Sequence, residues 1–315
     1  MKADGSPLRA VVLAYHDVGC AGLEELLAQG DEVLGVFTHE DDPGENVEFG
    51  SVAGLASARG LPVFTPQDVN RPEWVEAIRA LQPTILFSFY YRRMIAEEIL
   101  RIPPLGALNL HGSLLPRYRG RAPVNWVLVN GEVETGVTLH YMTAKPDAGD
   151  IVAQRRVAIE FEDTAPVLLR KIVVAARETL RDTLPLLRLG RAARVPQDLS
   201  CGTYCRGRRP EDGRIDWSRS AVAVHNLVRA VTRPYPGAFT FLGGRKLYVW
   251  AGRSLPSAGP RVEPGRVIGV ERERGAALVG TGDGTYRVDV CQLEGERDRH
   301  GAFLPVGTLL GAPSP

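Results

Sequence analysis

The chain has 315 residues, of which 44% are hydrophobic and 24% are charged, a composition typical of a globular protein with one or two domains. Its 38 Lys+Arg and 37 Asp+Glu leave a formal net charge of +1, which argues against a protein that wraps a nucleic acid. No apolar run approaches the ~20 residues of a membrane span, and residues 1–6 are too polar for a signal peptide, so we expect a cytoplasmic protein.

Short apolar runs alternate with helical patterns through the first half of the chain. A continuous apolar run is typical of a strand buried on both faces, whereas apolar positions three or four residues apart are typical of a helix. In chain order, strands are predicted over residues 9–15, 32–39, 61–65, 84–90 and 107–110, with helices over 19–30, 51–59 and 73–81. This alternation predicts an open parallel α/β sheet with helices on both faces.

The pattern changes from residue 136 onward. Two successive strands over 136–142 and 150–159 precede a long helix over 164–189, and the stretch after residue 200 becomes polar and basic. Beyond it, a helix and several short strands with Gly/Pro turns predict a small β-barrel: 220–231, 238–242, 246–250, 265–270, 277–280 and 286–293. We therefore expect an N-terminal domain over 8–204, a linker over 205–210 and a C-terminal domain over 211–305.

The sequence lacks the usual signatures of a metal or of a nucleotide cofactor. Cys201 and Cys205 form a C-x3-C pair with no second pair and no nearby His, so the cysteines are expected to be reduced. No GxGxxG motif follows the first strand, since Gly19 and Gly22 have the wrong spacing, and no phosphate-binding GxxxxGK[ST] loop occurs. We predict that neither a metal nor NAD takes part.

Asn109 and His111 end a predicted strand in the stretch Asn109-Leu-His-Gly-Ser-Leu-Leu-Pro116. Residues two apart on a strand share a face, and the carboxyl end of a parallel sheet is where ligands bind. A histidine can act as general base toward an amine, and a carboxamide N–H can hold a developing oxyanion. A carboxylate that orients the imidazole would come from Asp147 or from Asp150. The pattern indicates carbonyl or acyl transfer, and the other histidines near strand ends, including His140, are interpreted as structural.

That stretch, with Asp147-Ala-Gly149 downstream, resembles the signature of the folate-dependent formyltransferases. This family includes methionyl-tRNA, glycinamide ribonucleotide and sugar N-formyltransferases. Two further segments, Tyr118-Arg-Gly-Arg-Ala-Pro123 and Asn125-Trp-Val-Leu-Val-Asn-Gly131, are most similar to the formyltransferase domain of the bifunctional polymyxin-resistance proteins. That domain formylates UDP-4-amino-4-deoxy-L-arabinose, and the likeness covers the chain to about its last 20 residues.

The resemblance implies a Rossmann-like domain followed by a small OB-like β-barrel, with N10-formyltetrahydrofolate as co-substrate. By position it makes His111 the proton-handling residue, Asn109 the group that stabilises the formyl oxygen, and Asp147 the carboxylate that raises the pKa of the histidine. It also implies a set of folate-binding residues: Arg93, Met94, Ile95, Arg121, Thr143, Ala144, Lys145, Pro146 and Asp147. Arg117 and Arg119 are equally compatible with an anion contact and with a solvated loop.

Within the family, the alternative is a methionyl-tRNA formyltransferase, and outside it a non-catalytic folate or nucleotide binder. The His-Gly-Ser sequence at His111, where the tRNA enzyme typically has His-Ala-Ser, and the balanced charge favour a UDP-amino sugar as acceptor. The resemblance places the reaction in lipid A modification and polymyxin resistance. Since the bifunctional proteins continue into an NAD-dependent domain, whereas this chain ends at Pro315, a separate UDP-glucuronate decarboxylase is expected as a pathway partner.

Overall fold

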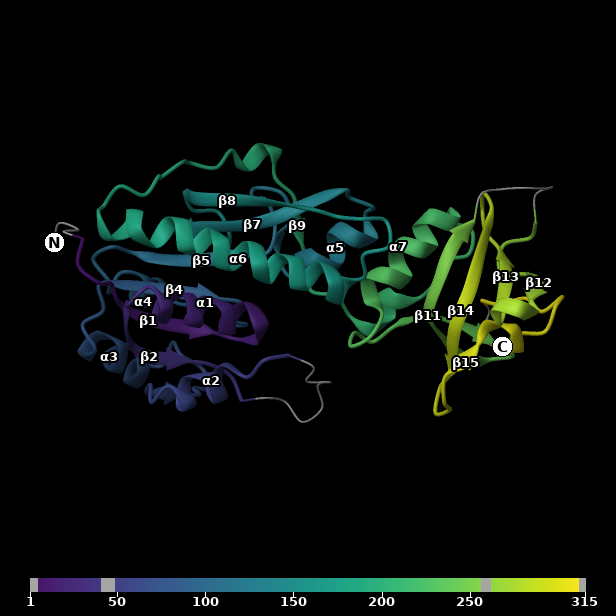
Figure 1. Cartoon of the computed structure of the whole chain (residues 1–315), viewed down its shortest axis with the longest axis horizontal. Helices are drawn as coiled ribbons and strands as arrows, with labels where there is room; N and C mark the ends of the chain where they lie inside the picture. The colour runs from purple at the N-terminus through teal and green to yellow at the C-terminus, as the bar shows by residue number, and fades with distance from the viewer. Residues whose placement is uncertain (1–4, 41–48, 256–261, 312–315) are drawn as a thin grey trace. The chain divides into compact units, whose positions relative to one another are not determined.

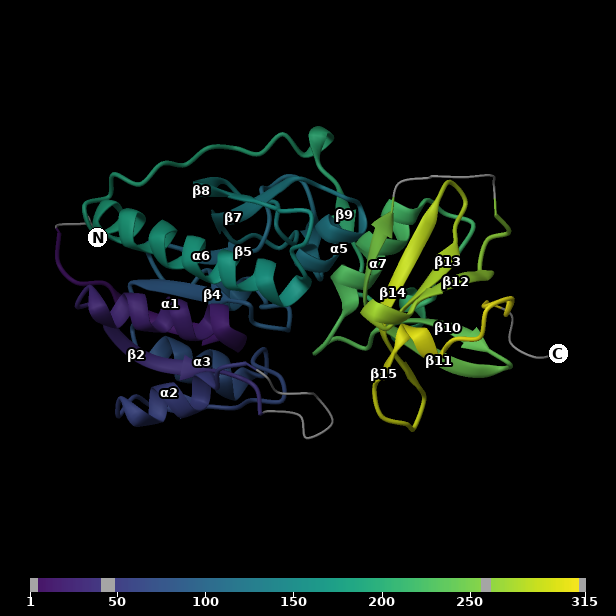
Figure 2. The ribbon, with the colours of Figure 1, turned by 45° about the vertical axis from the view of Figure 1, so that its right-hand side comes forward.

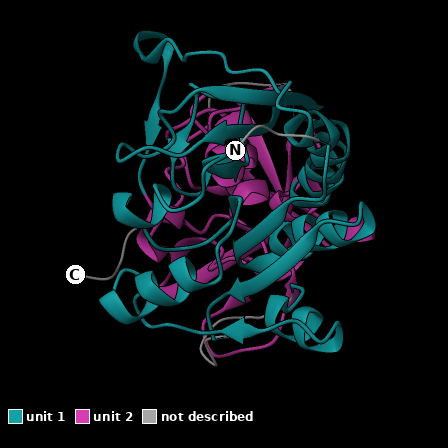
Figure 3. Ribbon diagram, turned by 90° about the vertical axis from the view of Figure 1, so that its left-hand side faces the viewer, with its two compact units in different colours: residues 1–123, 134–159, 169–206 teal, residues 124–133, 160–168, 207–315 magenta. Residues whose placement is uncertain are grey.

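The computed structural model describes residues 5–40, 49–255 and 262–311. The chain divides into two compact units, which Figure 3 colours separately. The first unit contains residues 1–123, 134–159 and 169–206, and the second contains residues 124–133, 160–168 and 207–315. Residues 124–133 and 160–168 therefore belong to the second unit, although in sequence they lie between segments of the first.

The first unit is built on a seven-stranded mixed sheet (Figure 1). In spatial order the strands are β3 (Val63–Phe64), β2 (Glu32–Phe37), β1 (Arg9–Ala14), β4 (Ile85–Phe89), β5 (Ala107–His111), β7 (Glu134–Tyr141) and β8 (Ile151–Ala158). The first five are mutually parallel, which confirms the predicted open parallel sheet. In contrast, β7 runs antiparallel to β5 and places His140 opposite Asn109.

Helices cover both faces of this sheet. The helices α1 (His16–Ala28) and α6 (Ala165–Arg188) lie side by side in Figures 1 and 2 and are joined by the ion pairs of Arg177 with Glu24 and of Arg181 with Glu25. The first unit also contains α2 (Val52–Ala58), α3 (Pro72–Ala80) and α4 (Glu97–Leu100). The long helix agrees with its prediction, whereas α4 and the helix α5 (Pro123–Val129) were not predicted because each spans only one or two turns.

The alternation of side chains along β1 explains why the sheet carries helices on both sides. Val11 and Leu13 point into a core that they share with Ile78 of α3 and Ile99 of α4. On the α1 side, Gly22 lies against the ring of Phe89, where any Cβ would come within 2.4 Å of a ring carbon. This contact requires glycine and lets α1 pack close to the sheet.

The second unit contains the helix α7 (Ala221–Val231) and an antiparallel sheet. In spatial order the strands are β10 (Ala238–Leu242), β11 (Arg245–Leu255), β14 (Thr285–Leu293), β13 (Ala276–Gly280) and β12 (Val267–Glu271), with the two-residue β15 (Arg299–His300) beside β14. Residues 308–311 contact both edges: the N–H of Val267 donates to the carbonyl of Thr308 at 2.8 Å, and that of Gly311 donates to Phe241 at 3.1 Å. The C-terminal domain is thus an antiparallel sheet whose two edge strands, β12 and β10, both accept contacts from residues 308–311.

A second, two-stranded sheet forms in the first unit, where β6 (Arg119–Gly120) pairs parallel to β9 (Tyr204–Cys205). Single 3-10 turns include η1 (Leu199–Cys201) ahead of β9 and η2 (Pro210–Gly213), η3 (Arg272–Arg274) and η4 (Gly301–Phe303) in the second unit. Part of the basic stretch interpreted as a linker therefore forms a strand. Among the described residues, no helix is long and apolar enough to cross a membrane.

Candidate active site

His111 is the last residue of β5, an interior strand, and the pairing of β5 with strands on both sides holds its backbone in place. The residue is only 7% exposed, and its side chain leaves the same face of the sheet as that of Asn109. Its Nε2 lies 2.8 Å from the carbonyl oxygen of Tyr118, which can only accept, so Nε2 carries the hydrogen. In the neutral ring, Nδ1 is then the nitrogen that can accept a proton.

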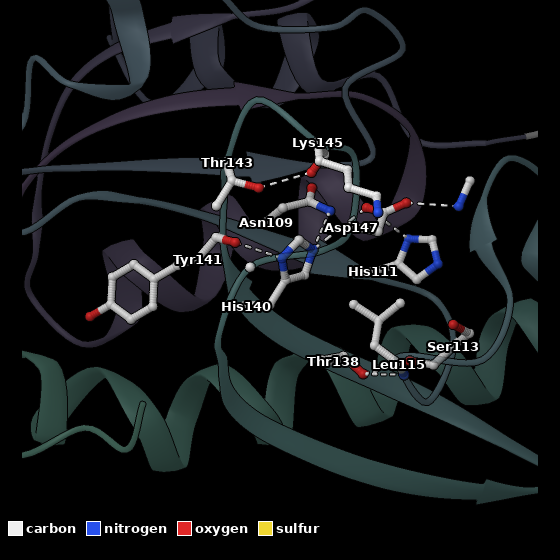
Figure 4. A network of polar contacts seen from close by, with 12 residues as sticks. Asn109, His111, Ser113, Leu115, Thr138, His140, Tyr141, Thr143, Lys145 and Asp147 are labelled. Carbon is white, nitrogen blue, oxygen red and sulfur yellow. Dashed lines mark hydrogen bonds and ion pairs between the residues drawn. The ribbon is translucent and has the colours of Figure 1, made fainter. Parts of the chain in front are cut away.

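Asp147 comes from the loop between β7 and β8 and meets the two histidines of the site (Figure 4). Its Oδ1 lies 3.6 Å from His111 Nδ1 and 3.6 Å from His140 Nε2, while its Oδ2 accepts the N–H of Gly120 at 2.8 Å. The alternative carboxylate, Asp150, instead pairs with Arg194 at 2.8 Å. The structure thus places Asp147, and not Asp150, beside His111.

His140 belongs to this cluster, although its sequence context indicated only a structural role. Its Nδ1 donates to the carbonyl of Tyr141 at 2.8 Å, so in the neutral ring Nε2 accepts a hydrogen bond from the carboxamide of Asn109 at 3.2 Å. This contact orients the carboxamide and leaves its second N–H for a ligand. Sequence reasoning missed it because the pairing of β7 beside β5 depends on strand order.

Burial and hydrogen bonds determine the protonation of the pair. Burial lowers the pKa of His111, while Asp147 and the carbonyl of Tyr118 oppose that shift. Burial alone would raise the pKa of Asp147, but His111, His140 and the N–H of Gly120 hold it well below its usual range. At neutral pH the cluster therefore presents an uncharged imidazole beside a carboxylate. A proton taken up at Nδ1 would be stabilised by that anion, as a general base requires.

Comparison of the chain with models of known protein families identifies its family. Residues 9–184 match the model described as formyl transferase, and residues 208–303 match that of the formyl transferase C-terminal domain. The chain belongs to the formyl transferase family.

Solved structures of other proteins share the fold of this formyl transferase. HypX from Aquifex aeolicus in complex with tetrahydrofolic acid has a TM-score of 0.65 and 20% identity, over 95% of this chain and 47% of HypX. An N-formyltransferase from Helicobacter canadensis in complex with folinic acid and dTDP-3-aminofucose has a TM-score of 0.65 and 19% identity. The match covers 89% of this chain and 98% of that protein. The sugar 3N-formyl transferase WlaRD, in the presence of dTDP and 5-N-formyl-THF, has a TM-score of 0.64 and 16% identity. The match covers 93% of this chain and 100% of WlaRD. The chain thus spans about half the length of HypX.

The residues expected to contact the co-substrate lie on three neighbouring segments of the formyl transferase. Arg121 donates from Nη2 to the carbonyl of Arg92 at 3.3 Å, and the adjacent Gly120 contacts Asp147, so the segments after β4 and β7 are linked through residues 120–121. Most of the side chains in question are exposed: Arg93, Met94, Arg121, Thr143, Ala144 and Lys145. Pro146 is half-buried, and Ile95 is only 5% exposed and packs in the core, so Ile95 offers a ligand its backbone alone.

Asn70 supports the segment after β4 and was not singled out from the sequence. Its side-chain nitrogen donates to the carbonyl of Met94 at 3.0 Å, and its side-chain oxygen accepts the N–H of Ala96 at 2.7 Å. A single carboxamide thus satisfies backbone groups on both sides of Ile95 and holds this segment in place. Asn70 lies far away in sequence from the residues that it holds, so local pattern gives no signal for it.

The histidine after β2 plays a structural part, as its context indicated. His39 stacks on Tyr91 with 4.3 Å between ring centroids, and its Nε2 accepts the N–H of Arg92 at 3.2 Å. Burial and the charges of Arg92 and Arg93 lower the pKa of His39 to about 4. The ring therefore stays neutral at physiological pH and fixes the start of the 91–93 segment.

No cluster of three or more His, Cys, Asp or Glu side chains suited to a metal ion occurs in the part of the chain that the structure describes. The thiol of Cys201 donates to the carboxylate of Asp198 at 3.3 Å, and all four cysteines are free. Burial raises the pKa of the Cys20 thiol to about 11 and that of Cys291 to about 12, so neither is a reactive thiolate at neutral pH.

Proposed function

We propose that this formyl transferase moves the formyl group of N10-formyltetrahydrofolate onto the amine of a nucleotide-linked sugar, specifically UDP-4-amino-4-deoxy-L-arabinose. The observation that carries the proposal is the convergence of Asn109, His111 and Asp147 at the end of β5, with a neutral base beside a carboxylate. Relatives of the same fold were solved with tetrahydrofolic acid, folinic acid or 5-N-formyl-THF, and one with dTDP-3-aminofucose.

In the proposed reaction the sugar amine attacks the formyl carbon of the folate. An N–H of Asn109 donates to the formyl oxygen as it becomes an oxyanion, a contribution of about 10²–10³ in rate. The attacking nitrogen gives its proton to Nδ1 of His111, and Asp147 stabilises the resulting imidazolium. As the bond from the formyl carbon to N10 breaks, the proton passes to N10. The products are tetrahydrofolate and the N-formyl sugar nucleotide.

The proposed folate site consists of Arg93 to Ile95, Arg121 and the loop Thr143 to Asp147. The guanidinium groups of Arg93 and Arg121 suit the carboxylates of a folate glutamate tail, because arginine presents a planar fork of donors. Met94, which is 57% exposed, offers an apolar surface to a ring system, and the backbone at Ile95 offers peptide groups to the edge of a pterin.

The choice of aminopentose depends on the segments Tyr118 to Pro123 and Asn125 to Gly131, whose resemblance is to the polymyxin-resistance enzymes. In that pathway a cationic amino sugar masks lipid A phosphates and weakens the attraction of cationic peptides to the membrane. Formylation would neutralise the amine during transfer to a lipid carrier. A separate UDP-glucuronate decarboxylase would supply the precursor.

A mass-spectrometric screen tests the proposal. The chain is incubated with N10-formyltetrahydrofolate and, separately, with the UDP-aminopentose, dTDP-3-amino sugars and methionyl-tRNA, and His111→Ala serves as the inactive control. Formylation of the UDP-aminopentose supports the full proposal. Turnover of another amino nucleotide-sugar keeps the reaction class and rejects the aminopentose, whereas formylation of methionyl-tRNA alone rejects the sugar acceptor.

A further inference from the structure

The segment from residue 195 to residue 205, here the 195–205 segment, follows α6 and runs along the edge of the first unit. It begins on the free edge of β8, where Val195 and Ile151 exchange backbone hydrogen bonds of 2.7 and 2.9 Å. It ends in β9, where the carbonyl of Cys205 accepts the N–H of Arg121 at 2.9 Å. The sequence pattern of this polar stretch gave it no role in the site.

Midway, the segment holds the loop that carries Asp147. The side-chain nitrogen of Gln197 donates to the carbonyls of Asp147 at 3.2 Å and Gly149 at 2.6 Å. Asp147 has a φ of 50°, a left-handed conformation that costs an ordinary residue about 1–2 kcal/mol. A conformation of this kind persists only where the surroundings hold it, and Gln197 supplies two of the hydrogen bonds that do so.

Further on, the segment holds the loop that touches His111. Tyr118 donates its N–H to Oγ1 of Thr203 at 2.7 Å, Arg119 donates its N–H to the carbonyl of Thr203 at 3.0 Å, and the N–H of Thr203 donates to Pro116 at 3.2 Å. Tyr118 is again left-handed, with a φ of 57°. Its carbonyl accepts from His111, and the N–H of the nearby Gly120 donates to Asp147.

The same segment therefore braces the two left-handed residues, Tyr118 and Asp147, whose groups meet the imidazole of His111. We propose that the 195–205 segment positions the His111–Asp147 pair, with Gln197 and Thr203 as its positioning residues. The assignment rests on the proposed function, since it deepens the roles of His111 and Asp147. It requires no contact between the segment and a substrate.

The close fit of the segment supports this assignment. A Cβ at Gly202 would lie 2.6 Å from the carbonyl oxygen of Pro116, and one at Gly120 would lie 2.3 Å from that of Cys205. Both glycines let two backbones approach directly. Arg119 lies next to this contact and is only 9% exposed. Its Nε has no hydrogen-bond partner among the described residues, so moving the segment away would alter the environment of a buried positive charge.

The test compares four variants of the full chain. Thr203→Val removes the acceptor for Tyr118 while keeping the shape, and Gln197→Leu removes the donor to the Asp147 loop. Thr203→Ser keeps the hydroxyl and serves as the rescue. Ser200→Ala is the matched control in the same segment, because the hydroxyl of Ser200 donates to Asp198 at 2.6 Å and does not contact either loop. Thermal unfolding verifies that each variant folds.

We expect Thr203→Val and Gln197→Leu each to lower kcat about tenfold, with the KM of both substrates changed by less than about twofold. The groups that face His111 within the described residues are Asp147, His140 and the carbonyl of Tyr118. Asp147 and the carbonyl favour the protonated ring, so loosening them lowers its pKa, and the acid limb of kcat/KM moves to lower pH. Thr203→Ser and Ser200→Ala should match the wild type.

Three results would overturn the assignment: an unchanged kcat and pH profile in Thr203→Val and Gln197→Leu, a Thr203→Ser variant as impaired as Thr203→Val, or equal impairment in Ser200→Ala. If Thr203→Val does not fold, Gln197→Leu decides. An NMR titration of the His111 imidazole separates this proposal from the proposed function. Should the wild type formylate no amino sugar, an altered titration in Gln197→Leu would still support positioning, and an unaltered one would reject it.

Discussion

Replacing Asp147 by Asn tests the proposed proton transfer most directly, because it removes a charge and preserves the shape of the side chain. In the wild type, the carboxylate Oδ1 lies 3.6 Å from Nδ1 of His111. A carboxylate at this distance favours the protonated form of a histidine and so raises the pKa of the ring. Asp147→Asn should therefore lower the pKa of His111, because the ring loses its anionic neighbour.

The sign of the pH effect follows from the role of His111 as a base. Activity requires the neutral ring, so the acid limb of kcat/KM reports the pKa of His111, which burial already lowers from its ordinary value. In Asp147→Asn a larger fraction of the ring is neutral at any given pH, and the acid limb moves to lower pH. The plateau falls at the same time, by about one to two orders of magnitude, because a base of lower pKa accepts a proton less readily.

The assay follows formyl transfer by mass spectrometry over a pH series, with Asp150→Asn as the matched control. Asp150 is two-thirds buried but pairs with Arg194, so its removal should leave the acid limb where the wild type has it. An acid limb that does not move in Asp147→Asn, or that moves to higher pH, would refute the reasoning. A shift in Asp150→Asn instead would transfer the orienting role to that residue.

Three further predictions follow from the same contacts. His111→Ala and Asn109→Ala should each lower kcat by about two to three orders of magnitude while calorimetry shows folate binding retained; near-normal turnover would remove that residue from the mechanism. Arg188→Ala should lower the free energy of unfolding by about 3–5 kcal/mol in urea titrations, because the fully buried carboxylate of Asp31 loses its ion pair. The control is Arg79→Ala, which removes an exposed ion pair and should leave the urea midpoint unchanged. Activity should survive exhaustive chelation, and a loss that zinc alone restores would contradict a metal-free reaction.

Much of the fold could be predicted from local pattern. Continuous apolar runs marked β1, β2, β4 and β5, because a strand buried on both faces needs apolar side chains in both directions. The short helices α4 and α5 escaped prediction, since one or two turns leave too little periodicity to detect. Local pattern also gave no sign that residues 124–133 and 160–168 group with the second unit, because they pack with a part of the chain far away in sequence.

The site divides in the same way. The sequence by itself determined that Asn109 and His111 share a face at a strand end, because residues two apart on a strand point the same way, and the family motif identified Asp147 as a candidate. Only the tertiary structure decided between Asp147 and Asp150, since a loop's path over the sheet depends on its long-range contacts. It also brought in His140, Gln197 and Thr203. The positions of these three residues depend on strand order and on hydrogen bonds between distant segments, and local periodicity predicts neither of these.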